Sequence, residues 1–81
     1  MTVKAYVLIE TQVGKTKQVV DAIRELQWVV SVDAVTGPYD VIAIIQGETL
    51  NDIGEIIMLK LHPLAGVSRT VICVAVVGLK P

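Results

Sequence analysis

The sequence is short of the residues that several protein classes require: it has no phenylalanine, one cysteine, one histidine and few arginines. The lone cysteine, Cys73, cannot form the internal disulfides that brace many small exported domains. Seven basic residues stand against eight acidic ones, so the chain has no basic surface for the phosphates of a nucleic acid. We therefore expect no direct contact with DNA or RNA.

Long hydrophobic runs are also missing. No apolar run reaches the roughly 20 residues of a membrane span, because charged residues interrupt each candidate, namely Asp40, Glu55, Lys60 and Arg69. The first residues lack the apolar stretch and cleavage site of a signal peptide. The expected location is the cytoplasm, with no membrane partner.

Hydrophobic residues, by contrast, are in surplus. They make up 53% of the chain and charged residues 19%, against about 45–50% and about 25% in typical domains. A length of 81 residues allows one domain, which we expect to span 1–81. A domain of this size has little interior, so part of the surplus is expected to lie in contacts between subunits.

The hydrophobic periodicity predicts the element order β-α-β-β-α-β. Strands are expected at 3–10, 29–36, 39–46 and 67–77, with helices at 15–27 and from Leu50 to just before Pro63. Gly37 and Pro38 form the short turn between the second and third strands, and Thr49 caps the second helix. Two βαβ-type halves with right-handed crossovers give an α+β, ferredoxin-like fold. Its four-stranded antiparallel sheet carries both helices on one face.

The other face of this sheet has no predicted cover. A face open to water carries polar residues at alternate positions, but Val41–Ile45 and Val71–Val77 are apolar on both sides. We therefore predict a dimer formed by pairing the open faces. The alternative is an untidy apolar surface.

The second helix has a second apolar group. Ile56, Met58 and Leu59 are expected to lie off the stripe that meets the sheet, which is formed by Leu50, Ile53, Ile57 and Leu61. This group predicts assembly beyond a dimer, and the alternative is a stray apolar patch on an exposed helix.

No catalytic or metal-binding pattern is recognisable. His62 and Cys73 lie in distant elements and lack a metal-ligand spacing. Gly14-Lys15-Thr16 would end a phosphate loop only if another glycine stood at Ile9. We predict no enzymatic activity, no metal and no cofactor. The alternative is a cofactor-free enzyme of the dimeric α/β-barrel type, with a polar cavity between sheet and helices and His62 or Tyr6 in it.

Three stretches resemble a known family: "VTGPYDVIAII", "TLNDIGEIIMLKL" and "HPLAGVSRTVICVAVV". From about residue 4 to residue 77 the chain is similar to the RAM (regulation of amino acid metabolism) domain. This is the effector-binding half of the Lrp/AsnC, or feast/famine, transcription regulators. The family's G-x-x-D hairpin is matched by Gly37 and Asp40, and its P-x-x-G-V turn by Pro63, Gly66 and Val67.

The resemblance implies a non-enzymatic sensor of amino acids. Family members pair their sheets face to face and then assemble dimers into rings, so an octamer or decamer-like ring is expected. They also carry a helix-turn-helix DNA-binding domain, for which this chain has no room. We therefore expect a stand-alone RAM domain that reaches DNA only through full-length Lrp/AsnC regulators. An ACT-like domain, which pairs sheets edge to edge, is the other alternative, and the apolar strand faces disfavour it.

The predicted ligand site lies at the hairpin. Asp40 is expected to bind the ammonium of the amino acid effector, since a charge-assisted hydrogen bond contributes roughly 1.5–3 kcal/mol. Backbone N–H groups of Gly37 and Tyr39 are expected to meet the carboxylate, and Tyr39 either lines the pocket or packs. The resemblance adds Thr70 and Ile72 as a polar contact and a side-chain wall. The alternative for Asp40 is a cap that bonds its own turn.

Overall fold

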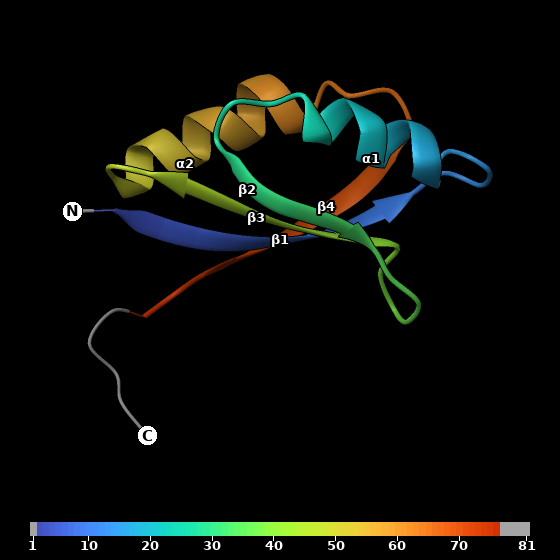
Figure 1. The fold of residues 1–81 in the computed structure, drawn as a ribbon, viewed down its shortest axis with the longest axis horizontal. Coiled ribbons are helices and arrows are strands. Elements are labelled where there is room, and N and C mark those ends of the chain that lie inside the picture. Colours follow the sequence, from blue (N-terminus) through green and yellow to red (C-terminus); the bar gives the residue numbers. More distant parts are fainter. Residues whose placement is uncertain (1, 77–81) are drawn as a thin grey trace.

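The computed structural model describes residues 2–76. Its elements are β1 (Val3–Thr11), α1 (Thr16–Arg24), β2 (Val29–Ala34), β3 (Val41–Gly47), α2 (Leu50–Ile56), the π-helix η1 (Ile57–Leu61) and β4 (Val67–Val74). The strands form an antiparallel sheet in the order β2-β3-β1-β4, and both helices lie on one of its faces (Figure 1). The predicted ferredoxin-like order is confirmed. The predicted last strand extended to Val77, which lies outside the described residues.

The core is one aliphatic layer between the sheet and the helices. The strands contribute Ala5, Val7, Ile9, Val32, Val41, Ala43 and Ile45, and the helices contribute Val19, Val20, Ile23, Ile53, Ile56, Ile57 and Leu61. Among residues 2–76 no polar or charged side chain is buried. Within the same residues no helix is both long enough and apolar enough to cross a membrane.

Helix α1 is shorter than predicted. It buries Val19, Val20 and Ile23 as expected, but it ends at Arg24 rather than Gln27. The backbone N–H groups of Glu25 and Leu26 donate to the carbonyls of residues 22 and 23, at 3.3 and 2.9 Å. These i to i−3 bonds tighten the last turn, and a tightened turn is a common way to end a helix.

Helix α2 begins with the predicted cap. The Thr49 hydroxyl accepts from the backbone N–H of Asp52, and the Asp52 carboxylate accepts from the backbone N–H of Thr49, both at 3.1 Å. This reciprocal pair satisfies two N–H groups that the first turn leaves without helical partners.

The buried stripe of α2 differs from the prediction. Ile53, Ile56 and Ile57 face the sheet, whereas Leu50 is 62% exposed. The prediction that Ile56 lies off the stripe was wrong, because the stripe is set by the i, i+3, i+4 group rather than by Leu50. Met58 and Leu59 are exposed as predicted, at 66% and 67%.

The stripe continues into the π-helix η1. The backbone N–H of His62 donates to the Ile57 carbonyl at 2.8 Å, an i to i−5 bond. Leu61, four residues after Ile57, is buried as the helical period predicts.

The connection between β2 and β3 is a loop of residues 35–40, not the predicted two-residue turn. It is closed by a hydrogen bond of 2.8 Å from the Val35 N–H to the Asp40 carbonyl. The Asp40 N–H donates instead to the Ile9 carbonyl of β1, at 2.9 Å. Asp40 therefore contacts β1 through its backbone. On either side of the loop, β2 ends at Ala34 instead of residue 36, and β3 begins at Val41 instead of residue 39.

The sheet face away from the helices is apolar at its centre. Residues that alternate with the buried ones point to this face. On β1, Tyr6 lies between Ile44 of β3 and Cys73 of β4, and Leu8 lies between Ile42 and Val71. No element of residues 2–76 covers them (Figure 1). We call this surface, formed by Tyr6, Leu8, Ile42, Ile44, Val71 and Cys73, the open face.

Gly66 should be required for stability. It has a φ of +95°, and a Cβ there would lie 2.9 Å from the Lys15 Cβ and 3.0 Å from the Val19 Cγ2. We expect Gly66→Ala to lower the free energy of unfolding by about 1–3 kcal/mol in urea denaturation. The matched control is Gly54→Ala within α2, where a Cβ meets nothing within 4 Å. Gly54→Ala should raise the free energy of unfolding by about 0.5–1 kcal/mol. Equal effects of Gly66→Ala and Gly54→Ala would contradict the structural requirement for Gly66.

Candidate functional site

The predicted ligand residue Asp40 has a structural contact with β1. Its Oδ2 accepts from the Thr11 backbone N–H at 2.8 Å and from the Thr11 hydroxyl at 3.2 Å. The Thr11 hydroxyl also lies 2.8 Å from that of Thr16, the first residue of α1. The carboxylate thus connects the β2–β3 loop to the end of β1, instead of capping its own turn as the alternative supposed.

This contact uses one of the two carboxylate oxygens. Oδ1 accepts no hydrogen bond from the part of the chain that the structure describes. The Asp40 side chain is half-buried, so this oxygen can meet a ligand at the surface. An oxygen held in place by its partner oxygen's hydrogen bonds loses little freedom when it binds a cation.

The remaining hairpin residues lie at the tip of the same loop. Gly37 is exposed with a φ of +150°, which favours glycine, and Tyr39 is half-buried. Within residues 2–76, their backbone N–H groups donate to no backbone carbonyl. The loop therefore presents two N–H donors and one carboxylate within a span of four residues.

Thr70 and Ile72 lie elsewhere on the sheet. The strand register places Val41, Ile9 and Thr70 in one row across β3, β1 and β4, so β1 separates Thr70 from the hairpin. The Thr70 hydroxyl lies 3.0 Å from the His62 Nε2. Ile72 lines an apolar cavity of about 310 Å³ between α2 and β4. The structure therefore groups Gly37, Tyr39 and Asp40 and leaves the two β4 residues apart from them.

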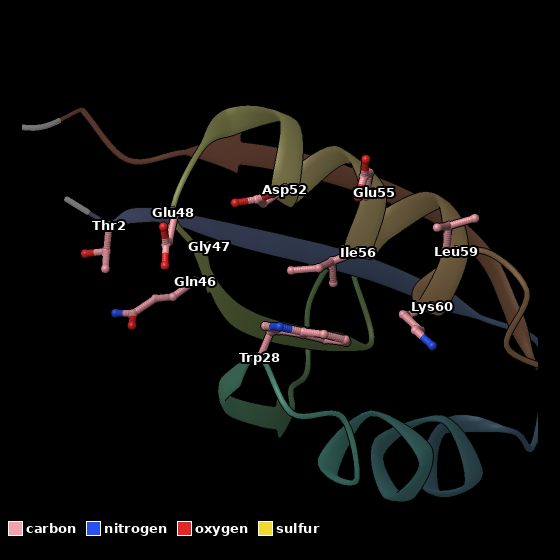
Figure 2. Close-up of a pocket in the computed structure, with 10 residues that line it drawn as sticks. All are labelled: Thr2, Trp28, Gln46, Gly47, Glu48, Asp52, Glu55, Ile56, Leu59 and Lys60. Carbon is pink, nitrogen blue, oxygen red and sulfur yellow. The ribbon is translucent and has the colours of Figure 1, made fainter.

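A larger cavity, which we call the β3-end pocket, has a volume of about 500 Å³. It lies between α2, the end of β3 and the connection from α1 to β2 (Figure 2). Its lining residues are Thr2, Trp28, Gln46, Gly47, Glu48, Asp52, Glu55, Ile56, Leu59 and Lys60. This cavity is not among the features predicted from the sequence. The pattern that could have indicated it is the placement of Ile56 and Leu59 near acidic residues on one helix face.

The residues named for an enzymatic alternative do not meet. Tyr6 lies on the open face, while His62 contacts Thr70, which shares the helix-covered face with its neighbour Ile9. The layer between sheet and helices is filled by aliphatic side chains rather than by a polar cavity. In the described residues no three of the His, Cys, Asp and Glu side chains are placed to hold a metal ion.

The fold is that of a small α+β domain with two helices on one face of a four-stranded antiparallel sheet. The chain belongs to the Lrp/AsnC ligand-binding domain family, whose family model matches residues 4–81. The resemblance stated from the sequence is confirmed. The family is a regulatory ligand-binding domain of transcription regulators. No curated protein matches the chain by sequence.

Solved structures agree with this membership. A protein from Thermus thermophilus is 29% identical with a TM-score of 0.90, covering 98% of this chain and 99% of that one. A hypothetical protein from Pyrococcus horikoshii is 27% identical with a TM-score of 0.86, covering 91% and 89%. A transcriptional regulator from Neisseria meningitidis, solved as a complex with L-Met, is 16% identical with a TM-score of 0.84. It is matched over 98% of this chain and 53% of its own length, and at that identity the likeness shows the fold alone.

The contact between Asp40 and Thr11 should be visible in stability. Asp40→Ala leaves two donors of Thr11 without their acceptor, so we expect a loss of about 1–3 kcal/mol in the free energy of unfolding. Asp40→Asn keeps an oxygen acceptor for Thr11, so its free energy of unfolding should fall clearly less than that of Asp40→Ala. Urea denaturation at one fixed protein concentration measures both. Wild-type stability of Asp40→Ala would show that the contact contributes nothing.

Proposed function

We propose that the protein is a non-enzymatic, homo-oligomeric module that binds a free amino acid and modulates full-length Lrp/AsnC regulators. Residues 1–81 would act as one ligand-binding unit in the cytoplasm, and contact with DNA would come from the full-length regulator. The chain belongs to a family of ligand-binding domains. The observation that carries the proposal is the state of Asp40 in its hairpin, where one carboxylate oxygen is held by Thr11 and the other is free to meet a ligand.

The hairpin offers the polar groups that an amino acid needs. Its ammonium would bind the Asp40 Oδ1, and its carboxylate would accept from the N–H groups of Gly37 and Tyr39. Pro38 has no N–H to give. The Tyr39 ring would form one wall of the site. The hydrogen bonds from Thr11 keep the Asp40 carboxylate oriented before the ligand arrives.

Thr70 and Ile72 would complete the site from another subunit. In one chain β1 lies between them and the hairpin, so they reach a shared ligand only when a second chain brings its β4 edge close. The Neisseria regulator solved with L-Met supports an amino acid as the kind of ligand.

The open face would form the dimer. Its apolar centre is flanked by charged residues at the same face, including Lys4 and Glu10 on β1 and Arg69 on β4. An apolar centre with a charged margin suits a two-fold interface between equal surfaces. The exposed Met58 and Leu59 of the helix layer would then contact neighbouring dimers in an octamer or decamer-like ring.

A charge on the open face should dissociate the dimer. We expect Ile44→Asp to lower the mass measured by light scattering at micromolar concentration, because the carboxylate would be desolvated in the interface. The matched control is Val13→Asp in the β1–α1 loop, where the side chain is fully exposed at 101%. The control should keep the wild-type mass. A wild-type mass for Ile44→Asp would exclude the open face as the interface.

A thermal-shift screen against the standard amino acids tests ligand binding. An amino acid at a concentration of about 100 times its dissociation constant stabilises the folded protein by about 2.7 kcal/mol. This raises the Tm by at least roughly 10 °C. Asp40→Asn keeps an acceptor for Thr11 but removes the charge, so the shift should disappear while the protein stays folded. Asp21→Asn, which removes an exposed charge from α1, should leave the shift unchanged.

No shift for any amino acid, with an intact oligomer, would leave Asp40 as a structural residue only. A shift that persists in Asp40→Asn would place the amino acid elsewhere on the chain. Either result would overturn the proposed hairpin site.

A further inference from the structure

The β3-end pocket lies at the opposite end of the sheet from the hairpin. Gly47, which lines it, pairs with Val3 at the start of β1, whereas Val41, next to Asp40, pairs with Ile9 near the end of β1. A ligand in this pocket therefore cannot touch the hairpin of the same chain. Its volume of about 500 Å³ is within the range of small-molecule sites, which is about 300–1,000 Å³.

One wall of the pocket is an aromatic ring. Trp28, the only tryptophan of the chain, is 39% exposed, and its ring lies along the cavity opposite α2 (Figure 2). Its position is fixed at the backbone, since its carbonyl accepts from the Gln46 N–H at 3.1 Å. Ile56 closes the facing side and is buried. An organic molecule between these side chains would be covered on two apolar sides.

The charges of the pocket are mainly negative. Glu48, Asp52 and Glu55 contribute three carboxylates and Lys60 contributes one ammonium. Figure 2 shows Glu48 and Asp52 at the β3 end and Lys60 at the other end, with the Glu55 carboxylate directed away from Trp28. The Asp52 Oδ2 already accepts from the Thr49 N–H, whereas the Glu48 carboxylate accepts no hydrogen bond from residues 2–76. Glu48 therefore offers two oxygens to a ligand beside Trp28, and Asp52 offers one.

We propose that the β3-end pocket binds a small organic cation with an apolar body, separately from the hairpin site. The apolar body packs between Trp28 and Ile56. The cationic head lies at the β3 end, where the Glu48 carboxylate accepts its hydrogen bonds and Asp52 adds negative potential. An anion of the same shape meets uncompensated carboxylates at this end and is rejected.

The single tryptophan makes the proposal directly testable. Phenethylamine, added to the folded protein, should change the Trp28 fluorescence in a saturable way when the indole is excited selectively. Phenylacetate has the same ring with the opposite charge and should give no saturable change. Phenethyl alcohol, the neutral relative, should bind about tenfold more weakly or worse, because it lacks the charge-assisted bond.

Variants locate the binding in the pocket. Glu48→Gln should weaken phenethylamine about tenfold or more, whereas Asp21→Asn, which removes the same charge from a distant part of α1, should not. Trp28→Leu removes the aromatic wall and the optical signal, so its loss of binding is measured by calorimetry. Asp40→Asn should leave the phenethylamine titration unchanged, which separates this site from the hairpin.

Three results would overturn the proposal. The first is no saturable change with phenethylamine in a folded protein, as would follow if a neighbouring subunit fills the pocket. The second is equal binding of phenethylamine and phenylacetate. The third is an equal loss of phenethylamine affinity in Glu48→Gln and Asp21→Asn, because the charges of the pocket would then not discriminate between ligands.

Discussion

Burial of one aliphatic layer between the sheet and the helices is the constraint on which the rest of the structure depends. Valine, isoleucine, leucine and alanine fill the layer alone, and Tyr6, Trp28 and Tyr39 stay partly exposed outside it. A layer of small side chains gives a limited hydrophobic gain in a chain of 81 residues. The apolar open face is a second surface that no element of residues 2–76 covers. In the proposed dimer, folding and assembly would draw on the same hydrophobic driving force.

The same layer moves polar chemistry to the ends of the sheet. At the hairpin end, Asp40 and Thr11 join two strands, and Thr16 extends the contact to the start of α1. At the other end of β3, Trp28 and Glu48 border a cavity. Each end combines residues from separate elements around an aliphatic core that contains no polar side chain within residues 2–76. These polar side chains therefore lie at the two ends of the sheet, outside the aliphatic core.

The sequence predicts those features that depend on neighbouring residues. The element order, the buried face of α1 and the Thr49 cap follow from local periodicity and capping, and the family resemblance covers nearly the whole chain. Contacts between distant residues were not predictable. Asp40 and Thr11 are 29 positions apart, and the residues that line the β3-end pocket range from Thr2 to Lys60. Ile56 was misplaced because the orientation of α2 is decided by packing on the sheet, not by its own periodicity.

The strand order also has a consequence for how the chain folds during synthesis. β1 is made first, yet it lies in the interior of the sheet between β3 and β4, the last strand to be made. Until β4 leaves the ribosome, one edge of β1 has no partner and its apolar residues remain accessible. An unpaired apolar edge is prone to wrong pairing with other chains. The sheet can close only after β4 has been made, so until then the growing chain is exposed to aggregation.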